Sequence, residues 1–204
     1  MLLTPNILKI SLDADSQIEA KMLKKIKFIK CEIVDEQESE YDLLICNKLS
    51  KKFKILLAIN NRKPILSSKW LEDSIANKTK MPYDKYYTKD KDFEKRFNFD
   101  LYKTLNETPY AVYMEEINFY VSDHVPNKDE IEELIESAGG IVLETYKNFK
   151  KKKERLIIIA DKNNDKEFIK LLKGKGNFSI YNVDLIINSV ITQELELEKV
   201  KYKM

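Results

Sequence analysis

The fold is decided by one stretch of sequence, Pro64-Ile65-Leu66-Ser67-Ser68-Lys69-Trp70-Leu71-Glu72-Asp73-Ser74-Ile75. A short apolar strand, residues 65–67, leads directly into a helix. We expect the Ser67 and Ser68 hydroxyls to cap the first N–H groups of that helix. Residues three and four positions apart share a helix face. That face carries the only tryptophan of the chain, so Trp70 is predicted to anchor a small core.

A weaker copy of this stretch returns near the end of the chain, as Ile180-Tyr181-Asn182-Val183-Asp184-Leu185-Ile186-Ile187-Asn188-Ser189-Val190. Asn182 stands 115 residues after Ser67, and Leu185 stands 115 residues after Trp70. Self-similarity at a fixed separation indicates repeated structural units. We therefore expect two copies of one domain, each within the usual size range for a folding unit.

The composition is that of a folded protein with a heavily solvated surface. Hydrophobic residues make up 43% of the 204 residues and charged residues 34%. The net charge of +2 is nearly neutral, so any binding to nucleic acid must be local. Cys31 and Cys46 are unpatterned and lie among apolar residues, which indicates buried thiols in a reducing compartment. No apolar run approaches the ~20 residues that span a bilayer, so we expect an intracellular protein without a membrane partner.

Apolar patterning predicts the same order of elements in both repeats. The first repeat reads as strands at 8–12, 31–34, 41–46 and 65–67, with helices at 16–30 and 50–60 and the helix that carries Trp70. The second has strands at 117–121, 141–143 and 156–160 and Gly139-Gly140 after its first helix, where glycine adopts the left-handed conformation without steric penalty. This order implies a small parallel sheet with helices on both faces.

The pattern is interrupted between the repeats by a segment rich in lysine, aspartate and aromatic residues. A free linker would not carry so many aromatic side chains, so we expect this segment to pack across the junction. The predicted boundaries are residues 1–80 for the first repeat, 81–112 for the aromatic-rich linker and 113–204 for the second repeat.

Trp70-Leu71-Glu72-Asp73-Ser74-Ile75, Gly139-Gly140 and the order of elements together carry a resemblance. The chain resembles a tandem pair of BRCT domains along essentially its whole length. The resemblance implies an α/β fold in which two repeats, each a four-stranded parallel sheet flanked by three helices, pack in tandem. Residues 64–88 and 93–99 are similar to the C-terminal pairs of DNA-damage checkpoint mediators and of fungal multi-BRCT scaffolds. Those pairs read the damage-phosphorylated C-terminal tail of histone 2A.

The resemblance also implies a phosphate-binding site in the first repeat. In phosphate-reading pairs, a hydroxyl residue at the position of Ser11, the backbone N–H of the next residue, here Leu12, and a lysine at the position of Lys54 bind the phosphate. Leu12 stands where the family usually has glycine. Lys51 matches the basic residue that meets a peptide's terminal carboxylate.

Two further residues are implied as contacts in the groove between the repeats, Ser122 and Asp184. The residues themselves leave a simpler interpretation open for Asp184, as a first-turn acid that the helix dipole favours. The lysines at positions 51, 52 and 54 crowd a helix N-terminus, where like charge is unfavourable unless an anion lies nearby. Taken alone, they suggest a solvated face; with the resemblance, they indicate a phosphoserine site.

We therefore predict a phosphoserine-binding module of a nuclear DNA-damage-response scaffold. Its partners would be a phosphorylated protein or a histone tail that ends in Ser-Gln-Glu and an apolar residue with a free carboxylate, together with other repair or checkpoint proteins. One alternative is a phosphate-independent scaffold that uses the groove between the repeats. Another is weak nucleic-acid binding through the basic stretch 150–155 and the lysines near Lys51.

The residues do not indicate an enzyme. His124 is the only histidine, and no cysteine lies near it at the spacing of a metal site. General-base catalysis through histidine would have that single residue available, and no nucleophile–base set is visible in the sequence. We predict neither a metal nor a cofactor.

Overall fold

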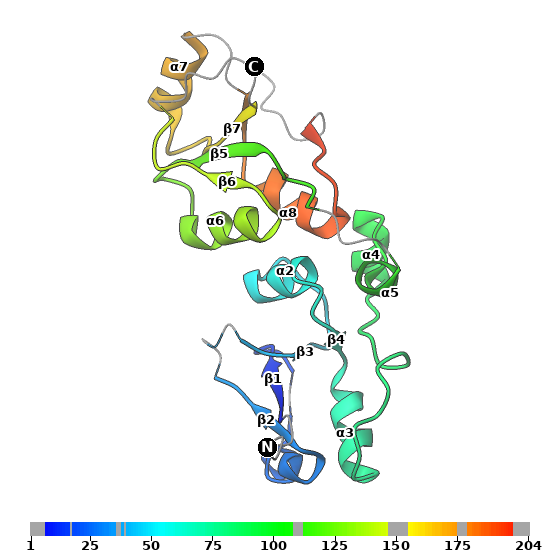
Figure 1. Ribbon diagram of the computed structural model, residues 1–204. Coiled ribbons are helices and arrows are strands. Elements are labelled where there is room, and N and C mark those ends of the chain that lie inside the picture. Colours follow the sequence, from blue (N-terminus) through cyan, green and yellow to red (C-terminus); the bar gives the residue numbers. More distant parts are fainter. Residues whose placement is uncertain are drawn as a thin grey trace, which may run out of the picture. The chain divides into compact units, whose positions relative to one another are not determined.

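The computed structural model describes residues 7–16, 18–35, 38, 40–107, 112–146, 155–174 and 179–197. The chain divides into two compact units, Met1–Thr108 and Pro109–Met204. Each unit contains a four-stranded sheet in which all pairs are parallel (Figure 1). The strand orders, β2-β1-β3-β4 and β6-β5-β7-β8, are the same in the two sheets. The predicted α/β fold class and the predicted repeat are confirmed.

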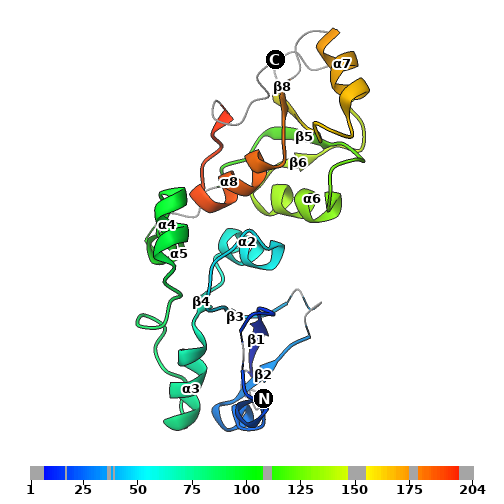
Figure 2. The ribbon, with the colours of Figure 1, turned by 180° about the vertical axis from the view of Figure 1, so that it is seen from behind.

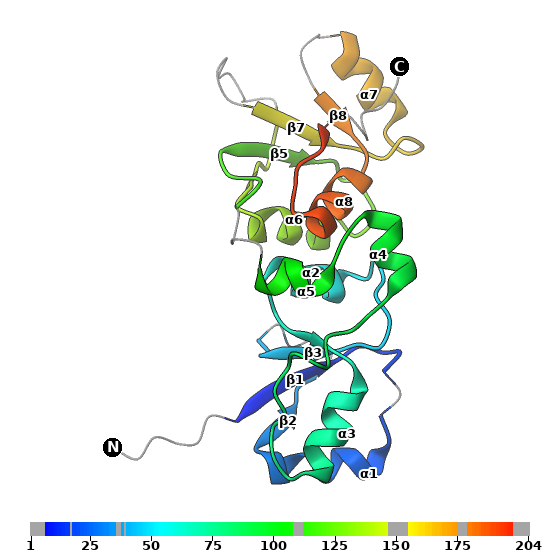
Figure 3. The same ribbon diagram turned by 90° about the vertical axis from the view of Figure 1, so that its right-hand side faces the viewer.

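The first unit places helices on both faces of its sheet (Figure 3). Its strands are β1 (Leu8–Leu12), β2 (Cys31–Ile33), β3 (Leu43–Ile45) and β4 (Ile65–Leu66). Its first helical elements are α1 (Ala20–Leu23), η1 (Ile26–Ile29), α2 (Phe53–Asn60) and α3 (Ser68–Ala76). Side chains alternate along a strand. Ile10 therefore faces the core beneath η1 and α3, and Ser11 faces the side that α2 covers.

Trp70 is the centre of the core between the first sheet and α3. Its side chain is fully buried, and its indole Nε1 donates to the Met81 carbonyl at 2.8 Å. The Tyr83 ring packs edge-on against it, with the ring centroids 5.7 Å apart. A buried indole N–H needs a hydrogen-bond partner, and the chain that follows α3 supplies it. The predicted anchoring role of Trp70 is confirmed.

The predicted first helix, residues 16–30, is broken into two short pieces. α1 covers only four residues, and η1 is a 3₁₀ helix that ends at Lys30 in the left-handed conformation. Ile26 and Ile29, three residues apart, are both buried, which suits the three-residue turn of a 3₁₀ helix. Lysines at helical spacing repel one another, and the α1 N-terminus has no side-chain cap, so a continuous helix is not favoured.

The serine caps expected from the sequence are also incorrect. Ser67 occupies the N-cap position of α3, but its side chain makes no capping bond. The Ser68 N–H instead donates to Oδ1 of Asn47, which reaches the helix from the loop after β3. Ser50 does not begin the next helix either: α2 starts at Phe53, and Lys52 is its N-cap residue without a side-chain cap.

The chain from 81 to 107, expected as a linker, packs on the first unit. It contains α4 (Lys91–Phe97) and α5 (Leu101–Asn106), whose N-termini are capped by Asp90 and Asp100. Leu101 is fully buried, and Arg62 next to α2 donates to the Thr104 carbonyl of α5. The aromatic residues noted in the sequence thus extend the core of the first unit.

The second unit repeats these layers (Figure 2). Its strands are β5 (Ile117–Val121), β6 (Ile141–Val142), β7 (Arg155–Ile159) and β8 (Ser179–Tyr181). Helices α6 (Lys128–Ser137) and α8 (Asp184–Thr192) cover one face, and α7 (Lys166–Gly174) covers the other. Leu185 is buried at the position equivalent to Trp70, and Gly139 has φ +86° after α6, as the sequence predicts. No helix among the described residues has the length and apolar character needed to cross a bilayer.

Candidate functional site

The end of β1 and the start of α2 meet at the C-terminal edge of the first sheet. The Asp13 N–H donates to the Ile45 carbonyl at 2.9 Å, which fixes the chain just past β1. The Lys52 Nζ lies 3.2 Å from both carboxylate oxygens of Asp13 and 2.5 Å from Oδ2 of Asp15. The two segments that the sequence assigns to phosphate binding therefore adjoin each other.

Ser11 lies just inside this edge, on the face of the sheet that α2 covers. Its side chain is fully buried, and its hydroxyl oxygen has no hydrogen-bond partner among the described residues. A buried hydroxyl without a partner loses its hydration without compensation, at a cost of about 1–3 kcal/mol. Such a group suits a site where an incoming acceptor completes the hydrogen bond.

Leu12 and Lys54 belong to the two chain segments that meet at this edge. Leu12 is the last residue of β1, and the residue pairs between β1 and β2 end before it, at Ile10 and Ile33. Its N–H therefore lies beyond the last pair of that ladder. Lys54 is half-buried in the first turn of α2, where the helix dipole contributes about half a positive charge.

Lys51 is exposed beside the aromatic end of α4. Its Nζ lies 5.3 Å from the centroid of the Phe97 ring, and the Arg96 Cζ lies 5.3 Å from the same centroid. Two cations thus lie near one ring in the first unit. The lysine at position 51 was predicted, but Arg96 was not, because only the packing of α4 brings it near Lys51.

The electrostatics of this edge are set by its ion pairs and by burial. Hydrogen bonds to Asp15 and Asp13 raise the pKa of Lys52 above its ordinary value. Burial raises the pKa of the Cys46 thiol to about 11, and the neighbouring Asp13 carboxylate adds to this increase. The thiol stays protonated at neutral pH and donates to the Lys48 carbonyl at 2.9 Å. Cys46 is therefore a structural neighbour of the site and not a nucleophile.

The equivalent edge of the second unit is occupied by a carboxylate of the chain itself. The Ser122 hydroxyl donates to Oδ1 of Asp165 at 2.6 Å, and Nδ1 of His124 lies 2.8 Å from the same oxygen. The other oxygen of Asp165 accepts the Asp161 N–H at 2.8 Å. The Asp165 side chain has no exposed surface, whereas the His124 side chain is 63% exposed, so the carboxylate is held inside the edge and the histidine faces solvent.

This Ser122–His124–Asp165 group is not a nucleophile–base pair. The Ser122 hydroxyl donates to the carboxylate, and the histidine also contacts the carboxylate, whereas nucleophilic catalysis needs the hydroxyl to donate to the histidine. In the part of the chain that the structure describes, no three His, Cys, Asp or Glu side chains are grouped to hold a metal ion. The network fixes the loop after β5.

The two units differ in charge at matching positions. Leu12 pairs with Ile45 in the first sheet, and Val121 pairs with Ile159 in the second. By this register Ser122 corresponds to Asp13. The residue just before the middle helix is Lys52 in the first unit and Asp165 in the second, and two residues later Lys54 is matched by Glu167. Over these three positions the first unit carries two positive charges, whereas the second, with Lys166 at the position of Phe53, carries a net negative charge.

The remaining predicted residues lie in the second unit. Asp184 is the first residue of α8, where its N–H donates to Oδ1 of Asn182 at 3.0 Å. Ser122, predicted to face a peptide, has its hydroxyl directed to Asp165 instead. Of the basic stretch 150–155, residues 150–154 lie outside the described residues, and Arg155 begins β7.

Comparison with known proteins identifies the fold. Residues 112–201 match the family model of the BRCT domain. Mouse PAX-interacting protein 1 is 26% identical over 78% of the chain, and human mediator of DNA damage checkpoint protein 1 is 26% identical over 78%. The chain spans 16% of the length of the mouse protein and 8% of the human protein.

Two solved tandem structures have the same arrangement of elements. The BRCT5-BRCT6 domains of S. pombe Brc1 superpose with a TM-score of 0.69 at 15% identity, covering 96% of this chain and 97% of that chain. Yeast Rtt107p in complex with phosphorylated histone 2A gives a TM-score of 0.62 at 16% identity, covering 97% and 92%. The chain therefore has the fold of a tandem BRCT pair, and residues 112–201 match the BRCT domain model.

Proposed function

We propose that the chain is a phosphoserine-binding tandem BRCT module of a DNA-damage-response scaffold. The phosphate would accept hydrogen bonds from the Ser11 hydroxyl, the Leu12 N–H and the Lys54 ammonium group. The observation that carries the proposal is the fully buried Ser11 hydroxyl without a partner, beside the basic start of α2.

The difference between the units supports an anion site in the first unit only. A phosphoserine brings roughly −1.5 to −2 charges and three acceptor oxygens. At the equivalent edge of the second unit, the Asp165 carboxylate already accepts the Ser122 hydroxyl, and Glu167 replaces Lys54. A second anion there would meet like charge.

Binding requires the side chains over Ser11 to move, because its hydroxyl has no exposed surface. The ion pair of Lys52 with the exposed Asp15 is a surface pair, and such pairs contribute little to stability. The phosphate dianion can replace Asp15 as the partner of Lys52. Three charge-assisted hydrogen bonds of about 1.5–3 kcal/mol each are sufficient for micromolar affinity after ordering costs.

Peptide selectivity would come from residues around the phosphate site. Lys51 would pair with the peptide's terminal carboxylate, and Arg96, which shares the Phe97 ring, would add positive charge there. Asp184 and Ser122 remain proposed peptide contacts, and Ser122 could serve as one only if its buried hydroxyl left Asp165. The ligand would be the phosphorylated tail of histone 2A, as in the Rtt107p complex, and other partners would be repair and checkpoint proteins in the nucleus.

A peptide titration tests the proposal. Histone-tail peptides ending in Ser-Gln-Glu and an apolar residue would be compared with and without the phosphate by calorimetry. The Lys54→Met variant should weaken binding of the phosphorylated peptide by about 10- to 100-fold, as expected for one charge-assisted hydrogen bond. Lys91→Met on α4 makes the same charge change at an exposed position and serves as the control.

The outcomes separate the site from the function. Equal affinity for both peptides would refute phosphate reading and would favour the phosphate-independent scaffold. The Lys52–Asp13 contact supports that candidate, because this lysine already has a carboxylate partner in the chain. If the Lys54→Met variant binds the phosphorylated peptide with full affinity and still prefers it to the unphosphorylated peptide, the phosphate binds elsewhere. A C-terminal amide on the peptide should weaken binding in the parent chain and have no effect in Lys51→Ala.

A further inference from the structure

The helical segment between β1 and β2 carries five exposed lysines around an exposed phenylalanine. They are Lys21, Lys24, Lys25, Lys27 and Lys30, and together with Phe28 they form what we call the α1–η1 patch. No acidic residue lies between the first and the last of them. Within the described residues, none of the five forms an ion pair. In a chain of net charge +2 this is a pronounced local excess of positive charge.

Phe28 is the most exposed large hydrophobic side chain in the described part of the chain, at 75%. Ile26 and Ile29 are buried, because the 3₁₀ turn directs these two residues to the core and leaves Lys27 and Phe28, which lie between them, outside. The ring is therefore exposed to solvent on a segment rich in lysine. An exposed aromatic face on a basic surface is available for stacking.

The α1–η1 patch continues to the N-terminal edge of the first sheet. The Lys30 carbonyl accepts the Leu8 N–H at 3.1 Å, which joins the end of η1 to the start of β1. Lys80 lies at this edge too, since it lines the same cavity as Leu8 and Lys9 of β1. Positive charge therefore extends from η1 along this edge.

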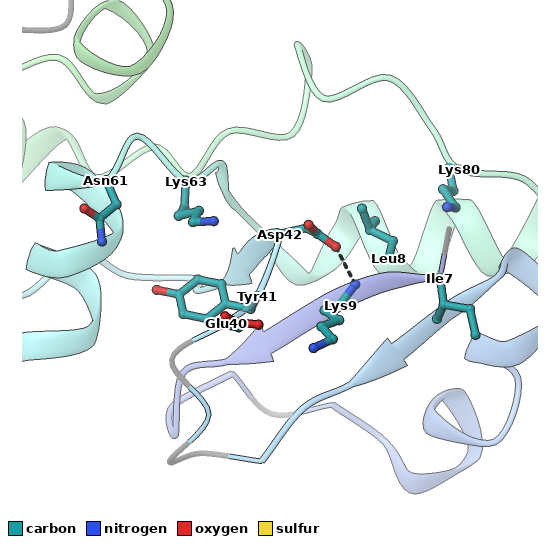
Figure 4. A pocket seen from close by; sticks show the side chains of 9 residues that line it. All are labelled: Ile7, Leu8, Lys9, Glu40, Tyr41, Asp42, Asn61, Lys63 and Lys80. Atoms are coloured by element: carbon teal, nitrogen blue, oxygen red, sulfur yellow. Dashed lines mark hydrogen bonds between the residues drawn. The ribbon is translucent and has the colours of Figure 1, made fainter. Parts of the chain in front are cut away.

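A cavity of about 810 Å³ opens at the same edge (Figure 4). Three lysines line it, Lys9, Lys63 and Lys80. The Lys63 Nζ lies 5.9 Å from the centroid of the Tyr41 ring, which forms part of the wall. Two carboxylates also line the cavity, those of Glu40 and Asp42, and Oδ2 of the latter accepts the Lys9 N–H at 2.7 Å.

We propose that the α1–η1 patch and this edge bind single-stranded nucleic acid. The patch lysines would contact successive phosphates, a base would stack on Phe28, and the strand would continue toward the cavity. A basic track with an aromatic platform is the combination that holds single strands without sequence preference. The ligand would occupy the edge of the sheet opposite to Ser11, so it would not compete with a phosphopeptide.

A membrane surface fits these residues less well. An interfacial helix inserts a continuous apolar face between lipids. Here Ile26 and Ile29 are buried in the core of the unit, and α1 is only four residues long. A single exposed ring remains, so the patch matches a soluble polyanion better than a bilayer.

The test is fluorescence anisotropy of the full chain with labelled single strands of about 20 nucleotides at several salt concentrations. For five phosphate contacts, log affinity should fall with log salt with a slope of about −3 to −4. The Lys24→Ala/Lys27→Ala variant should reduce this slope by about 1.4. Phe28→Ala should weaken binding by about 10-fold and leave the slope unchanged.

Matched controls separate the patch from general charge and hydrophobicity. Lys91→Ala/Lys95→Ala on α4 makes the same charge change in the same unit, and Leu171→Ala removes another exposed apolar side chain. Both should bind like the parent chain, and all variants should retain the parent's affinity for the histone-tail phosphopeptide. Titrations with a DNA strand and an RNA strand of the same sequence show which of the two nucleic acids is the ligand.

Three results would overturn the proposal. One is equal weakening by the α4 control, since binding would then reflect net charge alone. Another is a duplex bound as tightly as the single strand with no effect of Phe28→Ala, which would exclude stacking. The third is patch-dependent binding to phosphatidylserine–phosphatidylcholine vesicles without binding to single strands, which would indicate a membrane surface.

Discussion

At the candidate phosphate site, the ability of Lys52 to bind an anion depends on two single residues. Its ammonium group is held by Asp13, which is buried, and by Asp15, which is largely exposed. The buried Asp13 carboxylate joins the chain after β1 to the start of α2 through Lys52. The exposed carboxylate competes with any incoming anion, because it occupies the same ammonium group from the solvent side.

The Asp15→Asn substitution should therefore increase the affinity for the phosphorylated tail peptide. The loss of one surface ion pair releases Lys52, with an expected gain of about two- to fivefold. Calorimetry at low salt measures the effect, and it should diminish at high salt because exposed charges are screened. Asp92→Asn on α4 is the matched control and should leave the affinity unchanged. Weaker binding by Asp15→Asn would mean that this carboxylate organises the site.

Cys46 gives a second residue-level prediction, on pH dependence. Burial raises the pKa of its thiol from 9.0 to about 11. Between these values the unfolded chain releases the thiol proton and the folded chain keeps it, so the free energy of unfolding falls as the pH rises. Relative to Cys46→Ala, the parent chain should lose up to about 2 kcal/mol between pH 8 and pH 10.5 in urea unfolding. Parallel pH profiles for the two proteins would contradict the assignment.

At the scale of elements, the entry to α3 depends on a residue distant in sequence. The Ser68 N–H is satisfied by Oδ1 of Asn47 at 2.8 Å, and the side chain of Ser67 makes no capping bond. The loop after β3 thus holds the helix that carries Trp70. The Asn47–Ser68 hydrogen bond therefore connects the loop at the C-terminal edge of the sheet to the helix that packs on the core.

The Asn47→Ala substitution should lower the free energy of unfolding by about 1 kcal/mol, the usual effect of losing an N-cap side chain. Ser67→Ala is the control, and it should change stability by less than about 0.5 kcal/mol. Urea unfolding followed by the fluorescence of the single tryptophan measures both. The reverse order of effects would show that the serine hydroxyl caps α3 in solution.

At the scale of the whole molecule, one topology is used twice with opposite charge at the same edge. The two sheets share strand order and direction, yet Lys52 and Lys54 in the first unit are matched by Asp165 and Glu167 in the second. The duplication preserves the scaffold, because the buried strands need only apolar residues. Charge at the strand edge is free to differ between the copies, and under the proposed function it would direct the ligand to the first unit.

A titration with phosphoserine followed by backbone NMR should show this asymmetry. Signals of residues 11–15 and 51–54 should shift with one binding curve, because the first unit presents the basic edge. Signals of residues 121–124 and 161–167 should remain in place, since Asp165 already occupies that edge. Shifts of equal size in both units would show that the anion does not discriminate between them.

Much of the fold was predictable because it depends on local patterns. Alternating and continuous apolar runs predicted the strands, and the capped helix with Trp70 predicted the repeat at a separation of 115 residues. Gly139 was predictable because only a residue without a side chain adopts its left-handed conformation at no steric cost. The basic helix start near Lys54 was likewise visible in the sequence.

The amino-acid sequence by itself determined the duplicated α/β architecture, because burial pattern and local backbone preference are properties of neighbouring residues. Only the tertiary structure decided that Asn47 caps α3, that Asp165 closes the second edge and that Arg96 joins Lys51 at Phe97. It also decided that the lysine-rich segment forms a short 3₁₀ turn with Phe28 outside. These contacts join residues far apart in the chain or depend on packing against the sheet, and no local pattern specifies them.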